Sequence, residues 1–379
     1  MNDTHRQAWI QLALTPYVGA ESFLRLLQRF GSPQAALAAP ADAVRECLHH
    51  KQALAAWRGE SRQAVQAAEA ASAWAQQPDC RLMLLCDDDY PVMLTEGLTP
   101  PPLLFLRGDA ALLHRPAVAV VGSRHATPQA MRIARDFSEA MAAEGITVVS
   151  GMAAGIDTAA HRGALAAAGG GTVAVWGTGI NRIYPAANKA LAHQIADGGL
   201  IVSEFPLDTR PLAGNFPRRN RIIAALAQAT LVVEAAPESG SLITARLAAE
   251  MGREVMAVPG SIDNPHSKGC HKLIKEGAKL VECLEDILQE CPQLLQKQPM
   301  SSYSINIEVV PAAAGAKPVA AANEVMPGLL AAMGYDPVHP DSLAQQLQLP
   351  AAELYAQLLE FELEGTIAAM PGGRYQRIK

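Results

Sequence analysis

Several short segments of this 379-residue chain bring together glycine, hydroxyl and arginine residues, the residue types that hold phosphate groups. Gly122, Ser123 and Arg124 directly follow the apolar run 117–121 and precede an expected helix. The glycine allows a tight turn, backbone N–H groups at a helix N-terminus favour an anion, and the planar arginine fork matches phosphate. We therefore predict an anion site here, in preference to a turn with a surface arginine.

The most informative segment is 215–221, which reads NFPRRNR. The stretch 209–233 around it holds four arginines and no acidic residue, although the whole chain has a net charge of −6. A local positive field beside an aromatic ring provides phosphate neutralisation and base stacking, which single-stranded nucleic acid requires. The residues of this segment that we predict to contact nucleic acid are Phe216, Arg218, Arg219, Asn220 and Arg221.

An alternative interpretation treats these arginines as structural. They stand just before an expected helix at 222–227, and some of them could pair with Glu204 and Glu234. Arginine at a helix N-terminus is unfavourable for the helix dipole, however, and this favours a bound anion nearby. We expect Arg124 and Arg219 to lie on loops, so that replacing either would leave the fold intact.

Two further loops of small or polar residues follow apolar runs. Ser239, Gly240 and Ser241 offer hydroxyl and N–H groups at a helix start, where phosphate binding and simple capping are equally compatible with the sequence. Gly151 opens the loop 150–157, whose small residues leave room for a ligand. In that loop we expect Asp157 to cap the next helix rather than to form a catalytic pair with His161.

These loops all depend on one predicted architecture. Short apolar, valine-rich runs alternate with amphipathic helices such as 128–144, and such runs are typical of parallel strands buried on both faces. We predict a Rossmann-like, doubly wound, mostly parallel α/β sheet over 78–291, with ligands beyond the carboxyl ends of its strands. The runs are 81–85, 103–107, 117–121, 146–150, 172–176, 200–204, 230–234 and 254–258.

Three other regions flank the sheet. Residues 1–77 are predicted to be helical, with a helix-hairpin-helix or SAM-like turn at 18–20 that we interpret as packing rather than as a DNA contact. Residues 292–323, rich in Ala, Pro and Gln, are a predicted linker. Residues 324–379 suggest a winged helix whose two-stranded wing turns at Gly372 and Gly373.

The charge of the last region argues against duplex reading. Residues 301–379 hold eight acidic and four basic residues, a net charge of −4. The helix at 351–363, where a winged helix would read DNA, carries Glu353, Glu360 and Glu362 and no basic residue, so a major groove would repel it. We predict protein contacts for this domain, which counts against a winged-helix transcription regulator.

Composition excludes several other classes. The net charge rules out a basic nucleic-acid coat, and the chain has neither a G-x-S-x-G motif, nor a full dinucleotide fingerprint, nor zinc-ligand spacing. We therefore predict no catalytic residue, no metal and no cofactor. Cysteines without paired spacing, no signal peptide and no apolar run of about 18 residues indicate a cytoplasmic protein without a membrane partner.

Taken together, these loops resemble the DNA-processing protein A family (DprA/Smf). The resembling motifs are VVGSR (120–124), SGMAAGID (150–157), GTGINRIYP (177–185), NFPRRNRII (215–223), ESGSLITA (238–245), GREVMAVPG (252–260) and LIKEGAKLV (273–281). The resemblance implies a non-enzymatic mediator that binds single-stranded DNA, protects incoming DNA in natural transformation and loads RecA. It also implies a homodimer formed through the Rossmann-like domain.

The resemblance places the family's DNA-binding motifs on the residues already singled out in these loops. One departure is Ala154, where many members have a basic residue. The competing enzyme hypothesis is a nucleoside-monophosphate phosphoribohydrolase of the lysine-decarboxylase-like group. That group uses a Pro-Gly-Gly-x-Gly-Thr loop, and this chain has Pro-Glu-Ser-Gly-Ser at 237–241 instead.

Overall fold

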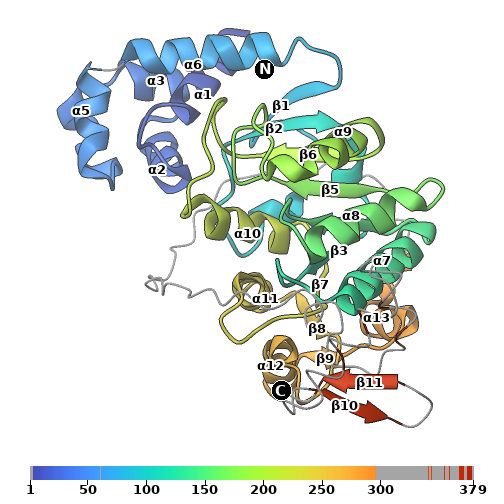
Figure 1. Ribbon diagram of the computed structural model, residues 1–379. Coiled ribbons are helices and arrows are strands. Elements are labelled where there is room, and N and C mark those ends of the chain that lie inside the picture. Colours follow the sequence, from blue (N-terminus) through green and yellow to red (C-terminus); the bar gives the residue numbers. More distant parts are fainter. Residues whose placement is uncertain are drawn as a thin grey trace.

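A nine-stranded sheet forms the centre of the protein, as the computed structural model shows (Figure 1). The structure describes residues 3–59 and 61–295, the single positions Pro340, Leu343, Leu354 and Leu358, and residues 367–370 and 374–377. The strand order is β1-β2-β6-β5-β4-β3-β7-β8-β9. The strands are β1 (Cys80–Leu84), β2 (Leu103–Gly108), β3 (Ala117–Val121), β4 (Thr147–Ser150), β5 (Thr172–Val175), β6 (Leu200–Ser203), β7 (Ala229–Val232), β8 (Glu254–Ala257) and β9 (Lys279–Leu280).

The predicted doubly wound, mostly parallel sheet is confirmed, with two differences. β1 pairs antiparallel with β2, and β2 pairs antiparallel with β6, although their apolar runs resemble those of the parallel strands. No long helix joins β1 to β2, and a parallel pair would need such a crossover. Strand β9 was not predicted, because its two residues have exposed side chains and produce no apolar run.

Helices cover both faces of the sheet. They are α7 (Pro128–Ala143), α8 (Ile156–Ala166), α9 (Lys189–Gly198), α10 (Asn215–Ala225), α11 (Gly240–Glu250), α12 (Lys268–Lys275) and α13 (Leu284–Glu290). Val118 and Val120 of β3 belong to the core cluster under α7 and α8, whereas Ala117, Ala119 and Val121 belong to the cluster under α10 and α11. The alternation follows from the period of two along a strand, so the sheet separates two cores.

The start of α7 illustrates how local sequence sets these helices. Thr127 is the N-cap, and its hydroxyl accepts a hydrogen bond of 3.2 Å from the N–H of Ala130. Pro128 follows at the first helical position, where its missing N–H costs nothing. Only six residues therefore separate the end of β3 from the start of α7, and this short connection holds the loop 122–126 at the carboxyl edge of the sheet.

The predicted helical N-terminal region packs against the β1–β2 side of the sheet (Figure 1). The indole N–H of Trp9 donates to the carbonyl of Pro102 over 2.8 Å, and Arg6 pairs with Asp87 at 2.9 Å. The helices are α1 (Asp3–Ala13), α2 (Ala20–Phe30), α3 (Pro33–Ala38), α4 (Ala41–Val44), α5 (Lys51–Gly59) and α6 (Ser61–Trp74). The boundary at 77/78 itself remains a prediction.

The C-terminal hairpin matches the predicted wing. β10 (Ile367–Met370) pairs antiparallel with β11 (Arg374–Arg377) on either side of the predicted turn. The linker is described only at 292–295, which form a 3₁₀ turn, and the helix expected at 351–363 is described only at Leu354 and Leu358. The rest of both predictions lies outside the described residues. Within the described part of the chain, no helix has the length and apolar character needed to cross a bilayer.

Candidate nucleic-acid interface

The strand order reverses between β3 and β7, because the chain runs from β3 through β4 and β5 to β6 and then returns to the other side of β3. Ligands of such sheets bind at the carboxyl ends of the strands near this reversal. A hollow of about 90 Å³ opens at this edge, between the loops that follow β3, β4 and β5 and the start of α10. It is lined by Arg124, Met152, Ala153, Ala154, Gly177, Thr178, Tyr184, Pro185, Phe216 and Arg219.

Phe216 forms the aromatic wall of this hollow. The Arg124 guanidinium lies 5.6 Å from the centre of the Phe216 ring, and the Tyr184 ring lies 5.6 Å away at an interplanar angle of 41°. Gly177 allows this position, because a Cβ there would stand 2.9 Å from Phe216 Cδ1. The structure thus brings the predicted residues Arg124 and Phe216 together, although they are far apart in the sequence.

Arg219 forms the floor of the hollow, and here the prediction of a loop position is wrong. The residue lies in α10 and is only 5% exposed. Its Nη1 donates to the carbonyl of Val175 at the end of β5, and both Nη atoms lie where a Cβ on Gly151 would stand. Gly151 therefore leaves the space that the buried guanidinium occupies.

The charge on Arg219 persists despite this burial. Burial lowers the pKa of Arg219 to about 10, and the nearby carboxylate of Asp157 opposes that fall. The Nε of Arg219 is buried and has no hydrogen-bond partner among the residues that the structure describes. Asp157 balances part of this buried charge, and the unused Nε–H donor of Arg219 suits the floor of the hollow to a phosphate oxygen.

Helix α10 starts at Asn215, seven residues earlier than the predicted helix at 222–227. Pro217 does not prevent this, because a proline in the first turn removes an N–H that has no partner within the helix. No side chain caps the helix. The predicted loop residues 216–221 therefore form the first turns of a helix, and they point in different directions around it.

The structural interpretation of the arginines holds for two of them. Arg218 lies 3.3 Å from Glu204, and Arg221 pairs closely with the same carboxylate, whose side chain is 3% exposed. Glu234 does not pair with them. It is buried and accepts hydrogen bonds of 2.9 Å from both the N–H and the hydroxyl of Thr127. This carboxylate therefore fixes the loop after β3.

The loop of Ser239, Gly240 and Ser241, called the serine loop below, lies beside the hollow rather than within its lining. Ser239 caps α11 by accepting a hydrogen bond from the N–H of Ser241, as the capping interpretation expects. Asn220 connects this loop to α10, since its side-chain amide donates to the Gly240 carbonyl over 3.3 Å. Ser123 is held against the same side of the sheet by a 2.7 Å hydrogen bond from its N–H to the Glu234 carbonyl. Gly122 precedes it in that loop.

Asp157 and His161 have structural partners. The prediction that Asp157 caps α8 is wrong, because the N-cap of this helix is Gly155 and no side chain caps it. Asp157 lies within the first turn, and its carboxylate accepts a hydrogen bond of 3.1 Å from the N–H of Ala153. His161 is buried between Thr172 and the carbonyl of Gly151, and burial lowers its pKa to about 4. Both ring nitrogens of His161 are hydrogen-bonded to these two partners, so the ring is not hydrogen-bonded to Asp157 as a catalytic pair would require.

Six residues of the hollow were not predicted as site residues: Met152, Ala153, Gly177, Thr178, Tyr184 and Pro185. Tyr184 is the most consequential, because its exposed ring lies beside Phe216. The signal was the position of the loop 177–185, which follows β5 and so reaches the same sheet edge as the loops after β3 and β4. Ala154 lies at the exposed rim, where a basic residue would stand close to Arg124.

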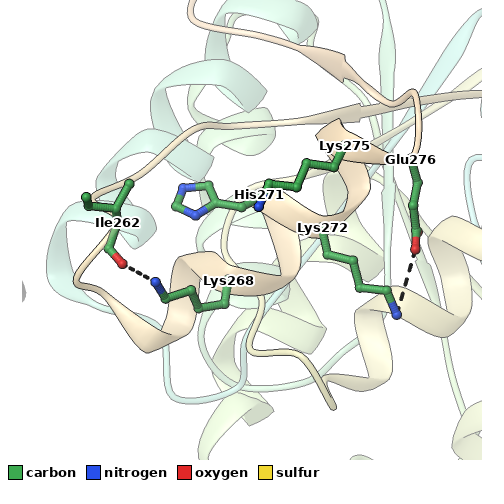
Figure 2. A pocket seen from close by; sticks show the side chains of 6 residues that line it. All are labelled: Ile262, Lys268, His271, Lys272, Lys275 and Glu276. Carbon is green, nitrogen blue, oxygen red and sulfur yellow. Dashed lines mark hydrogen bonds and ion pairs between the residues drawn. The ribbon is translucent and has the colours of Figure 1, made fainter.

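A separate hollow of about 450 Å³ lies along α12 (Figure 2). Lys268, His271, Lys272 and Lys275 line it together with the exposed side chain of Ile262. Lys272 lies 3.9 Å from Glu276, and Lys268 bonds to the Ile262 carbonyl, so two of the three lysines already have partners. Within the described residues, no three His, Cys, Asp or Glu side chains cluster as metal ligands would.

The Rossmann-like sheet, with a hollow lined by arginine and phenylalanine at its reversal point, agrees with comparisons to known proteins, which identify a DNA-processing protein. Three family models match successive parts of the chain: the DprA-like N-terminal HHH domain at 3–57, DNA recombination-mediator protein A at 81–292 and the DprA winged helix domain at 311–373. The chain belongs to this DNA recombination-mediator protein A (DprA/Smf) family, as the resemblance predicted.

Individual relatives and solved structures support the same family assignment. Protein Smf of Escherichia coli is 44% identical over 316 residues, which cover 82% of this chain and 81% of that protein. The X-ray structure of DNA processing protein A from Streptococcus pneumoniae is similar with a TM-score of 0.65 and 38% identity, over 74% of this chain and 95% of that one. A Helicobacter pylori DNA processing protein A, described for its single-stranded DNA binding mode, matches with a TM-score of 0.51 and 28% identity, over 56% and 96% of the two chains.

Proposed function

We propose that the protein binds single-stranded DNA in the hollow at the reversal point of the sheet, with bases stacked on Phe216 and Tyr184 and phosphates held by Arg124 and Arg219. The observation that carries this proposal is the arrangement of the two rings between an exposed and a buried guanidinium. Stacking accepts any base, and phosphate contacts carry no sequence information, so binding has little sequence preference. The single-stranded DNA binding of the Helicobacter pylori relative supports the same assignment.

We infer the wider role from the resemblance to the family. The protein is a cytoplasmic, non-enzymatic recombination mediator that protects incoming DNA during natural transformation and loads RecA onto it, acting as a homodimer through the Rossmann-like domain. The serine loop and Asn220 lie next to the hollow and guide the strand as it leaves Phe216. Glu238 stands within the segment 237–241, which lacks the Pro-Gly-Gly-x-Gly-Thr pattern of a phosphoribohydrolase, so the enzyme hypothesis has little support.

A competition titration tests the binding proposal. A fluorescent oligothymidylate is bound by the protein, and unlabelled single-stranded or duplex DNA of equal length is added over a range of salt concentrations. We expect single strands to compete much better than duplex, because duplex bases are already stacked on one another and cannot reach the rings. Equal competition by the two forms would refute the proposal, and release of free base from nucleoside monophosphates would instead favour the enzyme.

A further inference from the structure

Helix α10 also borders a hollow of about 390 Å³, which lies between it and the N-terminal helices and is called the second hollow below. Its lining includes Tyr17 and His50 from the helical region and Arg218 and Arg221 from α10. Residues three apart on a helix share a face, so Phe216 and Arg219 face the first hollow while Arg218 and Arg221 face the second. Helix α10 is therefore a wall between two hollows, and each receives arginine from it.

Tyr17 presents an aromatic surface at this second hollow. Its ring is 51% exposed and is stacked on the His50 ring, with 4.7 Å between the centroids and 11° between the planes. Its backbone has φ +63°, in the left-handed region that non-glycine residues rarely adopt. Such conformations persist where the surrounding structure holds them, and they concentrate at binding sites. The turn between α1 and α2 thus holds the Tyr17 ring toward solvent in an unusual backbone conformation.

The charges around the second hollow permit a phosphate. The Arg218 side chain is 50% exposed and shares the buried Glu204 carboxylate with Arg221, so two cations are balanced by one anion. Arg221 is further held by a 3.1 Å hydrogen bond to the Thr99 carbonyl, which leaves Arg218 as the accessible cation.

Glu21, a carboxylate in the lining of this hollow, is already paired with Arg25, which lies 2.9 Å from it. The His49 ring lies 3.2 Å from the same carboxylate. Neither Glu21 nor Glu204 therefore presents an unbalanced negative charge to the hollow.

We propose that this hollow is a second nucleotide-binding site, in which a base of the same single strand stacks on the Tyr17–His50 pair and its phosphate contacts Arg218. The inference rests on the proposed function, because it extends the path of the strand from Phe216 across α10 to the N-terminal helices. It assigns to the helical region a direct part in binding DNA. It also places the contact on an aromatic side chain rather than on the backbone of the helical hairpin.

The test compares oligothymidylates of about 4 to 30 nucleotides, because a short strand fills one hollow and a longer strand reaches both. We expect Tyr17→Ala to bind the shortest strands as the wild type does and to lose about fivefold or more in affinity for the longest, the loss of one stacked base. Tyr17→Phe retains the ring and should bind all lengths normally. Phe216→Ala should weaken binding at every length. Urea unfolding of each variant checks that the fold is intact.

The outcomes separate the two proposals. If the wild type binds no single-stranded DNA at any length, the proposed function fails and this inference fails with it. If the wild type and Phe216→Ala behave as expected but Tyr17→Ala binds every length normally, only the second site is refuted. Photocrosslinking of a bromodeoxyuridine-substituted long strand gives an independent result. The adduct should lie on the peptide that contains Tyr17, and its absence from that peptide would also overturn the inference.

Discussion

Arg124 and Arg219 line the same hollow but differ in burial, so replacing each by alanine should separate DNA binding from folding. Arg124 is exposed on the loop after β3. Arg124→Ala should weaken binding of single strands and reduce the slope of log affinity against log salt by about 0.7, the value of one phosphate contact. Its free energy of unfolding should stay within about 0.5 kcal/mol of the wild type, as for other surface substitutions.

Arg219→Ala should reduce the salt slope by a similar amount but also destabilise the protein. The Val175 carbonyl loses its donor, which costs about 1–3 kcal/mol when the acceptor is buried. Burial already raises the pKa of Asp157, and the variant removes the positive charge of Arg219 that opposes this rise. A carboxyl whose folded-state pKa lies above its unfolded value favours folding at low pH, and that stability is lost as pH rises through the folded-state pKa. The variant should therefore be less destabilised in acid than at neutral pH.

Urea unfolding at about pH 7 and about pH 5, together with fluorescence anisotropy over a salt series, measures both effects. The double variant Arg219→Ala with Asp157→Asn is a matched control, because it removes the ionisable carboxyl. Its destabilisation should not change with pH. The reasoning would be refuted if Arg219→Ala were as stable as the wild type at both pH values. It would also fail if Arg124→Ala were the more destabilised variant.

Three other predictions concern the aromatic rings of the hollow, its rim and the C-terminal region. Phe216→Ala should cost about 1–3 kcal/mol of binding free energy, and Tyr184→Ala should cause a smaller loss; titration calorimetry that found neither change would exclude base stacking in the hollow. Ala154→Lys should strengthen binding and steepen the salt slope by about 0.7, whereas Ala154→Gln should not; equal slopes in the two variants would show that this rim position does not face a phosphate. Truncation after residue 323 removes seven acidic and three basic residues, so the protein becomes four charges less negative and should bind single strands nearly unchanged; a tenfold loss in filter binding, about 1.4 kcal/mol, would show instead that the winged helix contacts DNA.

The apolar runs predicted the sheet well, because strands buried on both faces leave a continuous hydrophobic signal. An apolar run does not indicate the direction in which a strand runs relative to its neighbours. The antiparallel pairing of β1 with β2 and of β2 with β6 could therefore not be inferred from it. The two-residue strand β9 leaves no apolar run at all. The boundaries of the predicted strands agree with the structure within one or two residues, because each run ends where polar loop residues begin.

The residue types of the site were predicted from the sequence, but the burial of individual side chains was not. Residue types identified Arg124 and Phe216 as neighbours of one ligand, since both follow strands that end at one sheet edge. Burial was not visible in the sequence: Arg219 looks like its neighbours in a run of arginines, yet it alone among them turns inward, past Gly151, to the end of β5. Tyr184 was missed because a ring in a loop has no periodic pattern that would indicate which way it points.

The reversal of strand order has a consequence for synthesis on the ribosome. β3 and β7 are neighbours in the sheet, but more than 100 residues separate them along the chain. At about 5–20 residues per second, β3 waits roughly 5–20 s for its second partner, with one apolar edge unpaired. The nascent chain is a candidate for chaperone capture during this interval, because an exposed strand edge invites pairing with other chains. All the residues that line the binding hollow precede residue 229, so a chain that stops there carries the whole lining on a sheet that still lacks β7.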